Sequence, residues 1–281
     1  VLCISACMQV PLYVYSSISR SSHNYQNSLS RIVQFLNHEG RPKADDHKNK
    51  GQEDLAVSAK QSMFFWPNKS SIDHNFYLGC MTDTINFDIR RGHLVGVSGT
   101  TKSGKSSVLS AMVGWMPRHG QTGYMHVYGE VIFCGRQPQL LAGSIKQNVL
   151  FGLPLDHNMY TKAVTCSGLV RFLQMLPMGD ETVIGKSTSV ALDETFASCI
   201  ALARAVYKDA DVYIFDEILE RLDDQTRDLV WHSCILGQLK AKTVVVSLSL
   251  SSPYLAHCNS FLLVSASKQG LDTFSSVEAL A

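Results

Sequence analysis

Short apolar runs alternate with helical patterns over most of the chain after Ala59. The runs are rich in β-branched and aromatic residues and are separated by turn residues, as strands are. They cover residues 62–66, 76–80, 84–89, 93–98, 124–129, 131–134, 212–217, 243–249 and 260–264. Residues 156–176 and 197–207 have helical patterns instead. This alternation predicts an α/β fold with a largely parallel sheet that is covered on both faces.

The N-terminal part has a different pattern. Residues 1–18 carry no charge, and a bilayer span needs about 20 apolar residues. Two interpretations stay open for this segment: the cytosol-facing end of a transmembrane helix, or a buried amphipathic helix of a soluble domain. Residues 19–36 have a polar helical pattern with an apolar stripe, and residues 38–54 are typical of a linker. The stripe consists of Leu29, Ile32, Val33 and Leu36.

Composition excludes several classes of protein. With 25 basic and 24 acidic residues, the net charge of +1 provides no field for nucleic acid and no polybasic membrane footprint. A hydrophobic content of 45% with 17% charged residues indicates a chain that folds around a core. The eight cysteines are scattered without a CxxC pair, which disfavours a zinc site or disulfide framework and favours a reducing cytosolic setting. Because the first residue is Val rather than Met, we expect a piece of a longer chain.

A phosphate-binding motif follows the predicted strand at 93–98. Residues 99–106 read GTTKSGKS and match GxxxxGK[ST], directly before a helical run. Glycines let backbone N–H groups curl around phosphate oxygens, and the helix N-terminus adds its positive end. Lys105 would reach the β- and γ-phosphates and Ser106 would ligate Mg²⁺. The predicted phosphate loop is Gly99, Thr100, Thr101, Lys102, Ser103, Gly104, Lys105, Ser106 and Ser107.

A pair of carboxylates ends the predicted strand at 212–217. Asp216 follows four apolar residues, and a buried strand that ends in a carboxylate suits Mg²⁺ coordination opposite a phosphate loop. Glu217 is the candidate general base that would polarise an attacking water. The alternative is an ordinary strand end with solvated acids. The phosphate loop and the helical pattern just before this strand favour the functional interpretation.

The chain resembles the nucleotide-binding domain of ABC transporters. It is most similar to the first such domain of the C subfamily, the multidrug-resistance-protein and cystic-fibrosis-channel type. The most specific match runs from the signature helix into Walker B, and others lie after the Q-loop, at an adenine-stacking aromatic and after the last transmembrane helix. These stretches are residues 202–217, 143–152, 65–66 and 29–36.

The resemblance implies a P-loop NTPase fold, with a RecA-like core, an antiparallel β subdomain and a helical subdomain, preceded by the end of a transmembrane helix. Residues 1–38 would be that helix end and its cytosolic extension, and residues 39–60 a linker. Residues 61–281 would form the nucleotide-binding domain. Its helical subdomain would cover about 138–203, between core segments at about 61–137 and 204–281.

The resemblance also implies ligands and partners. ATP and Mg²⁺ would be the cofactors, with Trp66 stacking on adenine and Ser106 and Asp216 holding the metal. The Q-loop glutamine position holds Arg136, and Gln137 beside it would serve after a local shift. Partners would be a second nucleotide-binding domain and transmembrane domains, in a membrane protein whose cassette faces the cytosol. The transported substrate is unknown.

Several positions depart from the family pattern. The LSGGQ signature is replaced by LDETF at residues 192–196, so two carboxylates stand where phosphate would dock. Asp193 would instead cap the following helix. Ser249 stands at the position of a histidine that contacts the γ-phosphate, and a serine cannot replace the proton traffic of an imidazole. Of the D-loop, Asp223 keeps the pattern, whereas first domains of this subfamily often carry Asp at position 217.

Three function classes compete on this sequence: an active transport ATPase, a nucleotide-gated module that binds ATP with weak or absent hydrolysis, and a decayed structural domain. The intact phosphate loop and Asp216-Glu217 argue against decay. Ser249 and the lost signature argue against full activity. We therefore expect a cassette that binds Mg·ATP within a transporter. The alternative is a regulatory or structural cassette that does not itself power transport.

Overall fold

The computed structural model describes residues 22, 24–33, 36, 54–66, 76–77, 85–116, 123–185, 193–265 and 270–274. The chain divides into two compact units, Val1–Lys43 and Ala44–Ala281. In the first unit residues 24–33 are helical, as predicted, and the side chains of the apolar stripe are exposed. The uncharged segment 1–18 lies outside the described residues. Within the described parts, no helix combines the length and apolar character that a membrane span requires.

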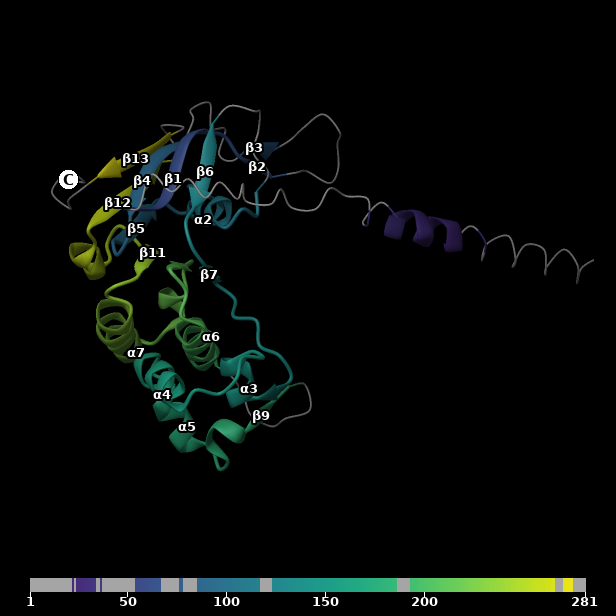
Figure 1. Ribbon diagram of the computed structural model, residues 1–281, viewed down its shortest axis with the longest axis vertical. Helices are drawn as coiled ribbons and strands as arrows, with labels where there is room; N and C mark the ends of the chain where they lie inside the picture. The colour runs from purple at the N-terminus through teal and green to yellow at the C-terminus, as the bar shows by residue number, and fades with distance from the viewer. Residues whose placement is uncertain are drawn as a thin grey trace, which may run out of the picture. The chain divides into compact units, whose positions relative to one another are not determined.

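A six-stranded sheet forms the centre of the second unit, in the order β13-β12-β5-β11-β10-β7 (Figure 1). All neighbours are parallel except β12 and β13. The predicted α/β fold with a largely parallel sheet is therefore confirmed. The strands are β5 (Leu94–Gly99), β7 (Val131–Cys134), β10 (Val212–Phe215), β11 (Thr243–Ser247), β12 (Ser260–Ser265) and β13 (Gly270–Phe274).

Alternating side chains of the central strands enter two hydrophobic cores. Ile214 and Val245 pack into one core together with Leu109 of helix α2 (Lys105–Met112). Phe215 and Val246 enter the other core, to which helix α6 (Glu194–Lys208) contributes nine of its ten buried residues. The continuous apolar runs of these strands follow from this two-sided burial.

A second, antiparallel sheet has the order β4-β1-β6 and supplies buried side chains to the core that contains α2. Its strands are β1 (Leu55–Ser62), β4 (Ile85–Arg90) and β6 (Tyr124–Val127). The predicted linker over 39–60 is wrong at its C-terminal end, because residues 55–60 belong to β1, and the domain begins before residue 61. The strand LAVSAKQS lacks aromatic residues, and its buried Ser58 is satisfied by donating to Asp88 Oδ1 at 2.6 Å.

The predicted strand at 62–66 contains the end of β1 and a separate strand, β2 (Phe65–Trp66), which pairs with β3 (Phe76–Tyr77). Among the described residues of this unit there are also three short 3-10 segments and a π-helix. The 3-10 segments are η2 (Gly179–Glu181), η3 (Leu219–Arg221) and η5 (Pro253–His257), and the π-helix is η4 (Val230–Gln238), which follows helix α7 (Asp224–Leu229).

Short helices surround α6 on the side away from the antiparallel sheet (Figure 1). They are α3 (Ile145–Leu150), α4 (His157–Cys166) and α5 (Val170–Met175), with a small ladder of β8 (Gly143–Ser144) and β9 (Val183–Ile184). Ser144 starts α3 with a capping box and Asp156 caps α4. The helical pattern at 156–176 is confirmed, with a break around Gly168, which has a φ of +73°. α6 continues past residue 203, where the helical subdomain was expected to end.

Candidate functional site

The loop between β5 and α2 has the backbone that a phosphate cradle requires. Gly99 has a φ of +154°, and a Cβ there would lie 2.2 Å from the Val264 carbonyl oxygen, so glycine is needed. Gly104 is the N-cap of α2 with a φ of +104° and provides no side-chain cap. The first turn of α2 also contains no acidic residue. The N-terminus of α2 is therefore open to an anion.

Two polar side chains of this loop favour the same ligand. Lys105 Nζ donates to the carbonyl oxygens of Gly99 and Thr100, at 3.0 and 3.2 Å, across the loop. Ser103 Oγ is buried and lacks a hydrogen-bond partner within the described residues. A buried hydroxyl without a partner is unfavourable unless a ligand completes it. A phosphate group fits both features.

Ser106 and Asp216, the predicted metal ligands, lie side by side although 110 residues separate them. Ser106 Oγ donates to Asp216 Oδ1 at 3.0 Å. Burial raises the pKa of the Asp216 carboxyl above its usual range, and the hydrogen bond from Ser106 opposes that shift. A hydroxyl and a carboxylate in contact at the end of a strand are oxygen ligands of the kind that Mg²⁺ takes. The donor set therefore fits the expected ion.

Glu217 lies opposite an arginine. Arg136 Nη1 is 3.3 Å from Glu217 Oε2, and the Glu217 backbone N–H donates to Ser247 Oγ at 3.1 Å. The parallel register pairs Cys134 of β7 with Phe215 of β10, so positions 136 and 217 follow neighbouring strand ends. Sequence reasoning missed this contact. The two predicted strands at 131–134 and 212–217 could have indicated it, because Arg136 and Glu217 lie at their C-terminal ends.

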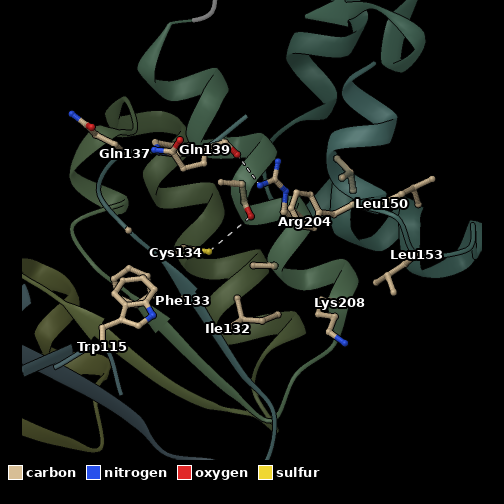
Figure 2. A pocket seen from close by; sticks show the side chains of 16 residues that line it. Trp115, Ile132, Phe133, Cys134, Gln137, Gln139, Leu150, Leu153, Arg204 and Lys208 are labelled. Atoms are coloured by element: carbon tan, nitrogen blue, oxygen red, sulfur yellow. Dashed lines mark hydrogen bonds between the residues drawn. The ribbon is translucent and has the colours of Figure 1, made fainter. Parts of the chain in front are cut away.

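Gln137 is placed elsewhere. It lines a cavity of about 610 Å³ in which β7 faces α3 and α6, together with Trp115, Phe133 and Arg204 (Figure 2). Arg204 stacks its guanidinium on the Phe151 ring, 4.5 Å from the centroid. Arg204 also donates to the carbonyl oxygens of Gln139 and Asn148. The structure thus brings Arg136, rather than Gln137, to the Asp216-Glu217 pair.

Trp66 lies next to the phosphate loop. Its indole Nε1 donates to Ser107 Oγ at 3.2 Å, and 39% of its surface is exposed. The remaining loop residues, Thr100, Thr101 and Lys102, are exposed. An exposed aromatic face beside a phosphate loop can stack on a base.

The start of α6 is occupied by internal contacts. Asp193 accepts a 2.6 Å hydrogen bond from the Phe196 N–H, which confirms the predicted N-cap. Glu194 Oε1 lies 2.6 Å from Arg221 Nη1. Thr195 Oγ1 donates to the Arg221 carbonyl oxygen and accepts from the Asp223 N–H. The pairing of Glu194 with Arg221 was not expected from the sequence, and it neutralises part of the negative charge at this helix start.

Asp223 connects α7 with the helical region. Its carboxylate caps α7 by accepting from the Thr226 N–H at 3.0 Å, and it forms an ion pair with Arg171. Burial opposes ionisation, but the hydrogen bonds from Arg171 and Thr226 outweigh it and lower the pKa of Asp223 to about 2. Asp223 therefore stays charged in contacts that hold the start of α7.

Replacing Asp223 by alanine is expected to lower the free energy of unfolding at pH 7 by about 0.5–2 kcal/mol, the usual loss for an N-cap. A depressed folded-state pKa stabilises only above the unfolded value, so the difference from wild type should disappear as pH falls from about 4 towards 2. Urea unfolding of wild type and variant, from pH 7 down to this acidic range, measures the difference in the free energy of unfolding. Asp224→Ala is the control, because that neighbouring side chain is 95% exposed. Equal losses in both variants would contradict the assignment.

Ser249 stands two residues after β11 at the position where a histidine was expected by resemblance. Its Oγ lies 3.1 Å from Ser251 Oγ, and it lines a cavity of about 360 Å³ with Glu220, Arg227 and Tyr254. None of the described residues that line this cavity is a histidine. The described site therefore has one carboxylate pair and no histidine at this position.

Residues 82–220 match the family model of the ABC transporter domain. The chain contains an ABC transporter domain. It is 31% identical to "ABC transporter C family member 3" of Arabidopsis thaliana over 85% of this chain. It is 28% identical to "Probable multidrug resistance-associated protein lethal(2)03659" of Drosophila melanogaster over 90% of this chain. The predicted resemblance to the C subfamily and the predicted P-loop NTPase fold are thereby confirmed.

A third relative is "Oligomycin resistance ATP-dependent permease YOR1" of Saccharomyces cerevisiae, which is 34% identical over 58% of this chain. The chain covers 15%, 19% and 11% of the lengths of these three relatives. Most of each relative therefore has no counterpart here.

Proposed function

We propose that this ABC transporter domain binds Mg·ATP and hydrolyses it weakly or not at all at its own site. The observation that carries the proposal is the contact of Ser106 with Asp216 beneath an open phosphate loop. Lys105 and the N–H groups at the start of α2 would bind phosphate oxygens. Ser106 and Asp216 would hold Mg²⁺, which supplies charge neutralisation of the phosphates when bound. Trp66 would stack on adenine.

Weak hydrolysis is supported by the surroundings of Glu217. It is the candidate general base, but its carboxylate is paired with Arg136, and position 249 carries a serine where the family pattern has a histidine. A general base must be free to accept a proton from the attacking water. These contacts favour nucleotide binding over completed hydrolysis at this site.

The domain would act within a membrane transporter, on the cytosolic side. The relatives are described as transporters or as a permease, which supports transmembrane domains and a second nucleotide-binding domain as partners. The start of α6 favours the alternative of a regulatory or structural cassette. Its groups bond to Arg221 and Asp223 of the same chain instead of staying open for a partner's nucleotide.

Calorimetric titration with Mg·ATP, followed by single-turnover analysis of the bound nucleotide, tests the proposal. We expect saturable binding, slow or undetectable conversion to ADP, and little change in turnover in the Glu217→Gln variant. A folded chain that binds no ATP would overturn the proposal. Rapid conversion that Glu217→Gln abolishes would assign the site to an active ATPase instead.

A further inference from the structure

The ion pair between Arg136 and Glu217 is the starting point. Arg136 Nη1 lies 3.3 Å from Glu217 Oε2. The two residues are neighbours because they follow the adjacent ends of the paired strands β7 and β10. The Glu217 backbone is fixed as well, since its N–H donates to Ser247 Oγ. Both ends of Glu217, backbone and carboxylate, therefore have partners within this chain.

We propose that Arg136 is a positioning residue that holds the Glu217 carboxylate and so keeps ATP hydrolysis at this site slow. The inference rests on the proposed function, because it requires ATP to bind beside Asp216. Arg136 acts through Glu217 and not by contact with the nucleotide.

The chemistry explains why holding this carboxylate matters. In hydrolysis the oxygen of a water bonds to the γ-phosphorus, the bond from that phosphorus to the bridging oxygen breaks, and ADP leaves with the electron pair. The water also gives up a proton, which a nearby base accepts. Asp216 accepts a hydrogen bond from the Ser106 hydroxyl and would ligate Mg²⁺. Glu217 is then the carboxylate of this pair that is left to act as the base. While the Arg136 guanidinium is paired with Glu217 Oε2, a water cannot take the same position on that oxygen.

The exposure of the pair sets the size of the effect. The Arg136 side chain is 65% exposed and that of Glu217 is 22% exposed. Partly exposed ion pairs are weak, so release of Glu217 is expected to raise the single-turnover rate about fivefold, and not by several orders of magnitude.

The test compares wild type with Arg136→Gln, Arg136→Lys, Glu217→Gln and the double variant Arg136→Gln/Glu217→Gln. Each is the full chain, with Mg·ATP binding measured before hydrolysis. We expect Arg136→Gln to be about fivefold faster, with a smaller change in the ATP dissociation constant. Arg136→Lys keeps a cation opposite Glu217 and should stay slow, and the double variant should lose the gain. Lys208→Gln is the control, because it removes a cation paired with Glu130 at 3.1 Å.

A second measurement needs no nucleotide. In thermal unfolding, Arg136→Gln and Glu217→Gln should not be additive, because both remove the same ion pair. A gain in the double variant equal to that of Arg136→Gln, a fast Arg136→Lys, or strictly additive unfolding temperatures would overturn the inference. If wild type binds no ATP, the proposed function fails; if ATP binds but Arg136→Gln is no faster, only the role of Arg136 fails.

Discussion

Replacement of Lys105 by alanine should weaken Mg·ATP binding about ten- to a hundredfold, since a charge-assisted contact to phosphate is worth about 1.5–3 kcal/mol. In the structure Lys105 Nζ bonds to the carbonyl oxygens of Gly99 and Thr100. Both acceptors belong to the same loop, whose conformation also depends on Gly99. We therefore expect the variant to fold. Calorimetry measures the affinity, and the unfolding temperature without nucleotide checks the fold.

Lys146→Ala provides the matched control. The ammonium of Lys146 also donates a hydrogen bond, to Glu181 Oε1 at 2.9 Å, but Lys146 lies on α3 and not in the phosphate loop. It should leave ATP affinity unchanged. If both lysine variants bind ATP as tightly as wild type, Lys105 does not contact the phosphates and the assignment of the loop is wrong.

The second large effect concerns the helix start at residues 193–195. Asp193→Ser, Glu194→Gly and Thr195→Gly together should strengthen ATP-dependent dimerisation with the proposed second nucleotide-binding domain. Two like charges about 4 Å apart repel by roughly 4 kcal/mol at an effective dielectric constant near 20. The Arg221 contact cancels part of that repulsion for Glu194, so the gain should be smaller than this figure. Glycines would also permit close approach of the backbone to phosphate.

The same three substitutions should destabilise the chain. Serine still caps α6, but two glycines in its first turn cost up to about 2 kcal/mol together, and the contacts of Glu194 and Thr195 with Arg221 are lost. Cross-linking with Mg·ATP measures dimerisation, and urea unfolding measures the loss of stability. Glu194→Gln separates charge from backbone approach. If the triple variant dimerises no better than wild type, either the placement of the signature or the repulsion argument is wrong.

The strands of the central sheet could be predicted because both their faces are buried. Continuous apolar runs such as that of β10 follow directly from this burial. β1 could not be found in this way, because its buried positions include Ser58 and its partner Asp88 lies far along the sequence. Local patterns carry no information on such a pairing.

The candidate site also contains local features that the sequence predicts and long-range contacts that it does not predict. The phosphate loop and the N-cap at Asp193 are local features, and their residue types could be read from the sequence. The contacts of Arg136 with Glu217 and of Glu194 with Arg221 depend on strand register and on the packing of η3 against α6. Charge and spacing alone could not place them.

The residues that depart from the family pattern occupy the same kind of position in the fold. Arg136, Ser249 and Asp193 each lie just outside a regular element, beyond β7, beyond β11 and before α6. At such positions the side chain can change while the buried strands and helix remain as they are. Single substitutions at Arg136 or Ser249 can therefore alter the chemistry of this site without disturbing the buried strands before them. Chemistry at this sheet edge can evolve separately from the scaffold that carries it.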